Sequence, residues 1–416
     1  MNECKLIKKV PVWPLWLLLF TSTDTLIFGT NSIKGFLFVP RIVGLLFVLM
    51  IPFILKEKIK IGKKTIVLFI LVMIASVSAY VNKMEILTIL SRIISIIVAY
   101  SIATNYNHKT YIKVFSDFIF FVSVVAIITE VFAYTYPTIF TQFPTLVNTA
   151  DYKFSAFFVG SMRYDFLENT LIRAEGIFWE PGAFSIYLNL AIMYELFFQV
   201  RIRYTRLIVM IISLFLTFST TGYIGFFVML VVYIVGAGHP QAKKTPIKRI
   251  VLGVIMLALV MGIVGFRDGL IYEIVFDKIK NSESTAITRY SSIVNGLEIA
   301  WNNPLWGVGS NKIRESMIYY ASRSSFGKNP MLTNTCIMQF ATFGMIFGGI
   351  YFYYTAKYFF KQKLSLISRI GLLITLLLLY CGETFYSFLP FIFVFYGIDS
   401  REQELVNENC VNQFTA

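Results

Sequence analysis

The sequence has few charged residues for its length. Asp, Glu, Lys and Arg make up 14% of the 416 residues, whereas 57% are apolar and 17% are aromatic. A soluble domain carries about 25% charged residues. The composition therefore excludes an ordinary soluble protein. Because unpaired backbone groups cannot face lipid, it predicts a polytopic membrane protein built from helices.

Histidine and cysteine are scarce as well, and the sequence contains no nucleotide-binding motif. The chain has 2 histidines and 4 cysteines, and they form no cluster with the spacing of metal ligands. No Asp-x-Asp pair is present to hold a metal for a nucleotide-sugar donor. The GKKT sequence at Gly62 has Glu57 where a P-loop needs its first glycine. We therefore expect no metal, no cofactor and no nucleotide chemistry.

What the sequence does contain is a series of apolar runs, about twelve of which approach the length of a membrane-spanning helix. Lys and Arg are concentrated in alternate loops, whereas the short loops on the other side hold only Lys34 and Lys83. Basic residues favour the cytoplasmic side, so both termini are predicted to be cytoplasmic. The net charge of +14 then reflects topology, and we expect no nucleic-acid partner. The predicted spans are residues 12 to 30, 36 to 55, 65 to 81, 86 to 103, 114 to 134, 182 to 200, 205 to 219, 222 to 237, 250 to 266, 331 to 355, 367 to 382 and 384 to 398.

Two long segments, 135–181 and 267–330, carry much of the polar sequence, and this topology places both outside. We expect a single membrane domain over residues 1–416, with a polar cytoplasmic tail over residues 399–416. Part of the second long segment has helical apolar periodicity up to Trp301. This helix either lies on the outer leaflet surface or packs on the first long segment.

Ionisable residues also occur inside or at the edge of the predicted spans. A charge in mid-membrane costs at least ~2.5 kcal/mol, so such residues are usually paired, snorkelled or functional. Several lie toward the outer ends of their helices, which favours a polar cavity open to the outer face. These residues are Asp24, Arg41, Arg92, Glu130 and Glu383.

The charged side chains on the predicted outer face that could take part in chemistry are arginines and carboxylates. The stretch RAEGIFWEPGAF, which begins at Arg173, precedes a helix whose N-terminus points outward. Arginine binds phosphate oxygens bidentately, and a helix N-terminus offers free N–H groups and a positive dipole end. Arg173 and Arg289, one in each long segment, are therefore candidates for binding a diphosphate group. Alternatively, Glu180 only favours the start of the helix, and Arg173 pairs with Glu175.

The order of these features resembles the O-antigen and polysaccharide repeat-unit polymerases (Wzy type), of the O-antigen ligase and polymerase superfamily. The resemblance covers roughly residues 170 to 355, and three stretches carry it. They are RAEGIFWEPGAFSIYLNLAI with Arg173, Gly176, Glu180 and Pro181, TRYSSIVNGLEIAWNNPLWGVGSN with Arg289, Pro304, Gly307 and Gly309, and NTCIMQFATFGMIFGGIYF from Asn334. Relatives often have an Arg in the turn after the first long loop, where this chain has STTGYIGF.

The resemblance implies an all-α, metal-independent membrane glycosyltransferase of the bacterial inner membrane, with 135–181 and 267–330 as its periplasmic loops. It would polymerise undecaprenyl-diphosphate-linked oligosaccharide repeat units into O-antigen or capsular polysaccharide during lipopolysaccharide biosynthesis. Arg173 and Arg289 would neutralise the diphosphate, and Glu180 or Glu175 would deprotonate the acceptor hydroxyl. Glu130 and Glu383 are further candidates for the base. The expected partners are undecaprenyl-diphosphate-linked glycans, the lipid bilayer, a chain-length regulator and a flippase.

Other functions fit parts of the sequence. A ligase would transfer glycan to the lipid A core or another acceptor. Ligases of the superfamily depend on a periplasmic histidine, and both His108 and His239 fall in predicted cytoplasmic loops, which favours a polymerase. A lipid-linked oligosaccharide flippase or other transporter is an alternative of a different class, although transporters tend to have repeated halves, which this sequence lacks. An assembly subunit without chemistry is a third alternative.

Overall fold

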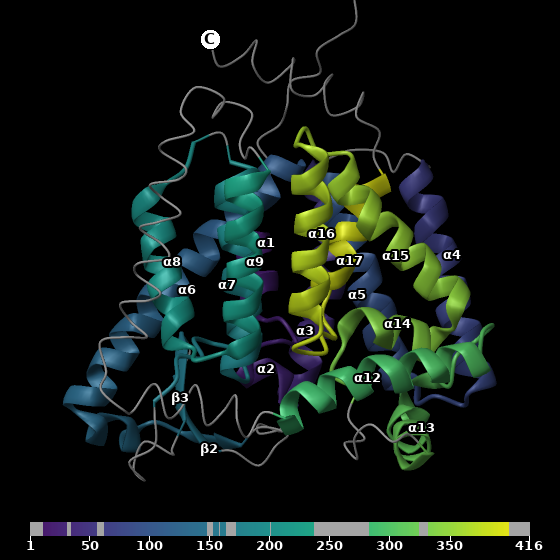
Figure 1. Cartoon of the computed structure of the whole chain (residues 1–416), viewed down its shortest axis with the longest axis horizontal. Helices are drawn as coiled ribbons and strands as arrows, with labels where there is room; N and C mark the ends of the chain where they lie inside the picture. The colour runs from purple at the N-terminus through teal and green to yellow at the C-terminus, as the bar shows by residue number, and fades with distance from the viewer. Residues whose placement is uncertain are drawn as a thin grey trace, which may run out of the picture.

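The computed structural model shows a bundle of helices with a small sheet and two further helices at one end (Figure 1). Among the residues that the structure describes, three helices are long and apolar enough to cross a membrane: α4 (Lys63–Val81), α5 (Ile86–Asn105) and α6 (His108–Thr135). Several shorter apolar helices accompany them, so the chain is a mostly helical membrane protein, as its composition predicted. The structure describes residues 11–30, 35–55, 62–147, 153–157, 159–163, 172–199, 201–236, 283–323 and 332–398.

The centre of the bundle is α7 (Pro181–Phe197), which is buried around its whole circumference. A helix that is apolar on every face packs against neighbours on all sides. It contacts α6, α8 (Tyr204–Leu216) and α9 (Thr220–Val235). The other half of the bundle contains α3 (Val39–Leu55), α15 (Met345–Phe360), α16 (Leu366–Tyr380) and α17 (Leu389–Ile398).

Some predicted spans are interrupted. The run 12 to 30 forms α1 (Trp13–Phe20) and α2 (Leu26–Gly29), separated by a non-helical stretch. The run 331 to 355 forms α14 (Thr335–Phe343) and α15, which are divided at Gly344. Gly344 has a φ of 91°, and a Cβ there would lie 2.5 Å from the Leu305 carbonyl oxygen, so a close backbone approach requires glycine at this break. The predicted span 250 to 266 and the tail 399–416 lie outside the described residues.

The first long segment contains a three-stranded antiparallel sheet that the helical prediction did not include. After the short 3-10 helix η2 (Pro137–Gln142) come β1 (Thr145–Val147), β2 (Lys153–Phe157) and β3 (Gly160–Arg163), in the order β1-β2-β3. In its register Ser155 pairs with Thr145 on one side and with Met162 on the other. The sheet contacts α6 through β3.

The second long segment forms α12 (Glu283–Asn302) and α13 (Gly309–Arg323), which lie at the same end of the bundle as the sheet (Figure 1). The helix predicted up to Trp301 is thus present as α12. It packs against α13 and α14, and Trp301 is 75% exposed. The N-terminus of α7 and the connection from α16 to α17 also lie at this end, so segments far apart in the sequence meet here.

Candidate active site

The residue that begins α7 does not cap it. Glu180 occupies the N-cap position with an extended backbone, and Pro181 follows as the first helical residue. The Glu180 side chain makes no capping hydrogen bond and instead accepts one from Trp179 Nε1 at 3.0 Å. The carboxyl group is therefore held beside the helix N-terminus, where it can serve another purpose.

A second carboxyl group reaches the same place from the connection between α16 and α17. A Cβ added to Gly182 would lie 2.5 Å from Glu383 Oε1, so the Glu383 carboxyl sits directly against the first turn of α7. It makes a side-chain hydrogen bond with Glu180. Both side chains are partly exposed, so the pair is within reach of a ligand.

The surroundings of the pair raise the pKa of Glu383. Desolvation, reinforced by the neighbouring Glu180 carboxyl, raises this pKa well above its usual range, and Arg289 and Arg173 partly oppose the shift. Two carboxyl groups placed this close together repel each other when both are ionised, which favours a proton on one of them.

Backbone contacts from α14 fix the connection that carries Glu383. The Thr335 hydroxyl donates to the Glu383 carbonyl oxygen at 2.6 Å and accepts from the Phe385 N–H at 3.0 Å. The Thr384 hydroxyl donates to the Leu332 carbonyl oxygen at 2.7 Å. Thr335 is fully buried, so these bonds are sheltered from water.

Asp24 and Arg92, two of the ionisable residues predicted to line an outer cavity, contact the part of this connection that follows Glu383. Asp24, which is fully buried in the break between α1 and α2, accepts hydrogen bonds from Ser387 Oγ and, at 2.7 Å, from Tyr187 OH. The Arg92 guanidinium lies over the Tyr386 ring, 3.9 Å from its centre. Their charges thus position the connection instead of facing the outer surface.

Arg173 and Arg289 approach the carboxyl pair from the two long segments. Glu383 interacts electrostatically with both guanidinium groups, and Glu180 interacts with both as well. Desolvation lowers the pKa of each arginine, and the neighbouring carboxylates counteract it. The two residues predicted for a diphosphate site therefore lie around one centre, although no short contact joins them.

Arg173 also has a structural role. Its Nε and Nη2 donate to the carbonyl oxygens of Thr217 and Phe218 at 3.0 and 3.1 Å, at the end of α8. Free carbonyl groups at a helix C-terminus favour a cation. The Arg173 guanidinium thus binds the two residues that directly precede the STTGYIGF stretch.

Glu175 and Glu130, two other candidates for the base, are both buried. Glu175 is 1% exposed, and neither of its carboxylate oxygens has a hydrogen-bond partner among the described residues. Burial raises its pKa well above the usual range, with Arg173 and Arg163 opposing. Glu130, on α6, is 5% exposed and interacts with Glu175 rather than with the pair. The pair of Glu180 and Glu383 is therefore the more accessible arrangement for chemistry on a ligand.

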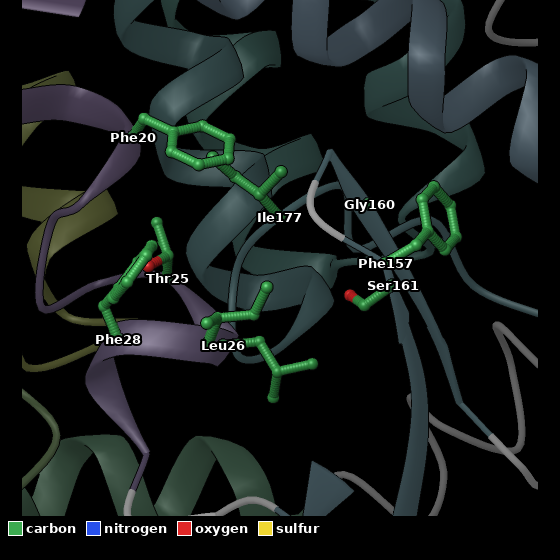
Figure 2. Close-up of a pocket in the computed structure, with 9 residues that line it drawn as sticks. Phe20, Thr25, Leu26, Phe28, Phe157, Gly160, Ser161 and Ile177 are labelled. Atoms are coloured by element: carbon green, nitrogen blue, oxygen red, sulfur yellow. The ribbon is translucent and has the colours of Figure 1, made fainter. Parts of the chain in front are cut away.

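A separate small pocket lies beside the α1–α2 break. Figure 2 shows Phe20, Leu26 and Phe28 on one side, facing Phe157 and Ser161 of the sheet across it. Its lining residues are uncharged, so it lacks the groups that could bind a phosphate. Among the described residues, no group of three or more His, Cys, Asp or Glu side chains is placed to hold a metal ion.

The fold and this site define a helical membrane protein with an arginine-flanked carboxyl pair at one end of its bundle. A family model described as O-antigen ligase matches residues 206–353, a segment that runs from α8 into α15 and includes Arg289. The chain therefore contains an O-antigen ligase domain, part of the O-antigen ligase and polymerase family, which confirms the resemblance seen in the sequence. Proteins of this family are enzymes that transfer lipid-linked glycans. No curated protein matches the chain.

Proposed function

We propose that this protein polymerises undecaprenyl-diphosphate-linked oligosaccharide repeat units into O-antigen or capsular polysaccharide at the periplasmic face of the bacterial inner membrane. The observation that carries the proposal is the carboxyl pair at the N-terminus of α7 with Arg173 and Arg289 around it. Such a centre offers what glycan transfer from a lipid diphosphate needs, which is cations for the leaving group and a base for the acceptor hydroxyl.

In this reaction the bond between the anomeric carbon and the diphosphate oxygen breaks while the acceptor hydroxyl attacks that carbon. The diphosphate gains negative charge as it leaves, and fixed guanidinium groups stabilise that charge without reorganising. Arg289, which interacts electrostatically with Glu383 and Glu180, supplies this contact, and Arg173 adds its field from the end of α8. A carboxylate of the site removes the acceptor proton, without metal or cofactor.

The proposed topology has about twelve spans, each close to the length that crosses the hydrocarbon core. It forms a single membrane domain with both termini cytoplasmic and with 135–181 and 267–330 as periplasmic loops. In support, every group of the site comes from those two segments, the start of α7 or the α16–α17 connection. The role also calls for a flippase to supply repeat units and a chain-length regulator as partners.

The second candidate function is O-antigen ligation, which is favoured by the match to a family described as O-antigen ligase. Against it stands the position of His108, at the first residue of α6, where its Nε2 lies 2.6 Å from Tyr358 OH. The 28 residues of α6 span about 42 Å at 1.5 Å per residue, so His108 lies at the other end of the bundle from the sheet. His239 lies outside the described residues.

Deletion of the gene separates these functions in the cell. If the protein is the polymerase, the surface lipid carries a single repeat unit and no ladder of longer chains on a gel. Long polymer that is not attached to the lipid A core identifies a ligase instead. Accumulation of lipid-linked repeat units on the cytoplasmic side identifies a flippase, and either of the last two outcomes refutes the proposal.

A further inference from the structure

Glu383 belongs to none of the sequence stretches that carry the family resemblance, and it lies beyond the matched segment 206–353. Its carboxyl group nevertheless lies against the first turn of α7: a Cβ on Gly182 would lie 2.5 Å from Glu383 Oε1 and 3.4 Å from the Glu383 Cδ. Gly182, which has no side chain, thus leaves the space that the Glu383 carboxyl occupies.

The position of this carboxyl is fixed from both sides. Thr335 binds the backbone of Glu383 and of Phe385, while Ser387 and Tyr187 converge on the buried Asp24. Groups that perform chemistry work best when their supports hold them within about 0.5 Å of the productive geometry. A connection made only to join α16 to α17 would not need this many buried polar contacts, each of which requires a matched partner.

The partner carboxyl is fixed as well. Glu180 stands at the N-cap of α7 but uses its side chain to accept from Trp179 and to bond with Glu383. An N-cap residue that makes no capping hydrogen bond forgoes helix stabilisation, so the other contacts of the Glu180 side chain have to compensate for that loss. The structure thus directs both carboxyl groups toward each other and toward the arginines.

From this geometry, and resting on the proposed function, we infer that Glu180 and Glu383 act together as the base of glycan transfer, with Glu383 as the residue that takes the acceptor proton. The reaction begins with the Glu383 carboxyl group deprotonated. As the acceptor oxygen bonds to the anomeric carbon, its proton moves to a Glu383 carboxylate oxygen. The bond electrons of the breaking C–O bond leave with the diphosphate. The protonated Glu383 then releases its proton to water and is ready for the next cycle.

The test uses the full-length protein in lipid nanodiscs with undecaprenyl-diphosphate-linked repeat units, and initial rates measured from pH 5 to 9. Glu383→Gln keeps the shape and the hydrogen bond but cannot take a proton, so we expect kcat to fall 10²–10⁴-fold with KM nearly unchanged. Glu315→Gln, at an exposed position on α13, is the matched control and keeps wild-type rates. Glu180→Gln removes the neighbouring carboxyl, so the acid limb of the pH–rate profile moves to lower pH.

Glu383→Asp keeps the proton-accepting group and covers the case in which Glu383→Gln does not fold. We expect Glu383→Asp to retain a rate at least 10-fold above that of Glu383→Gln. Where Glu383→Gln protein is not obtained, we expect Glu383→Asp to have a measurable rate whose pH profile still requires a deprotonated carboxyl group. A Glu383→Gln rate within 3-fold of the Glu315→Gln control overturns the inference. So does a Glu180→Gln profile that does not move, because Glu180 then does not influence the titration of Glu383.

Failure of the proposed function gives different results from failure of the base assignment. Wild-type protein that elongates no repeat units but transfers glycan to a lipid A core acceptor refutes the polymerase role, and the same variants then test the pair in the ligation assay. Wild-type protein that elongates chains, together with Glu383→Gln protein that elongates them at the control rate, refutes the base alone.

Discussion

Gly182→Ala is expected to disable transfer without unfolding the protein. The added Cβ would lie 2.5 Å from Glu383 Oε1, whereas ordinary contacts begin at 3.4 Å, so the carboxyl has to retreat by about 1 Å. A misplacement of about 1 Å in a reacting group can cost 10²-fold in rate. The backbone itself accepts the change, because Gly182 does not have a positive φ and Ala exceeds Gly in helix propensity by about 1 kcal/mol.

The assay is the elongation rate in nanodiscs beside the thermal melting temperature of each variant. Gly349→Ala is the matched control, because Gly349 lies in α15 and a Cβ there meets nothing within 4 Å. We expect the control to keep its rate, and Gly182→Ala to lose about 10²-fold with an unchanged or higher melting temperature. Shortening the acid should relieve the clash, so Gly182→Ala/Glu383→Asp should lose less than the two single losses combined. A fully active Gly182→Ala enzyme would refute the placement of Glu383 at the site.

Three other predictions concern charges. Arg173→Ala should lower stability by about 2 kcal/mol, since it removes charge-assisted hydrogen bonds to the end of α8, whereas Arg289→Ala should abolish long chains at an unchanged melting temperature. Glu175 has a folded-state pKa well above its unfolded value, so the folded state binds the extra proton and stability falls as pH rises above the unfolded pKa. Glu175→Gln should therefore flatten that fall in melting experiments from pH 5 to 9. Arg203→Ala should cost about 3 kcal/mol in melting experiments, because it leaves the fully buried Glu195 carboxylate without its ion-pair partner.

The helical architecture was predictable because a membrane leaves few alternatives to helices for an apolar chain. The ends of α4, α5 and α7 agree with the apolar runs to within three residues. The sheet was not predicted, since β2 and β3 are short and their pairing depends on contacts with α6 rather than on a strong local pattern. The finer claim of about twelve spans stays a prediction.

For the site, the sequence pointed to Arg173, Arg289 and Glu180, but it did not show which carboxyl group is best placed to act as the base. Arg173, Glu175 and Glu180 are neighbours in one polar stretch, and nothing in that stretch indicates that Glu175 turns inward while Glu180 turns toward Glu383. Pairing across the fold is a tertiary property, and Glu383 was recognisable only as an acid beside a glycine at the edge of a span. The sugars accepted depend on the shape of the cavity, which no local motif encodes.

The interrupted helices explain why Asp24, which was predicted to face an outer cavity, is instead fully buried. A run such as 12 to 30 stays apolar across its break, so hydropathy alone predicts one continuous helix. Non-helical backbone at membrane depth persists only where protein groups satisfy it. In the break between α1 and α2 the Asp24 N–H donates to Ser22 Oγ, and the Leu26 N–H donates to the Ile177 carbonyl oxygen. The Asp24 carboxyl accepts from Ser387 and Tyr187, and Thr335 holds the connection that carries Glu383. Asp24 and Glu383 thus both lie where an apolar helix has ended, and these places build the support on which the carboxyl pair rests.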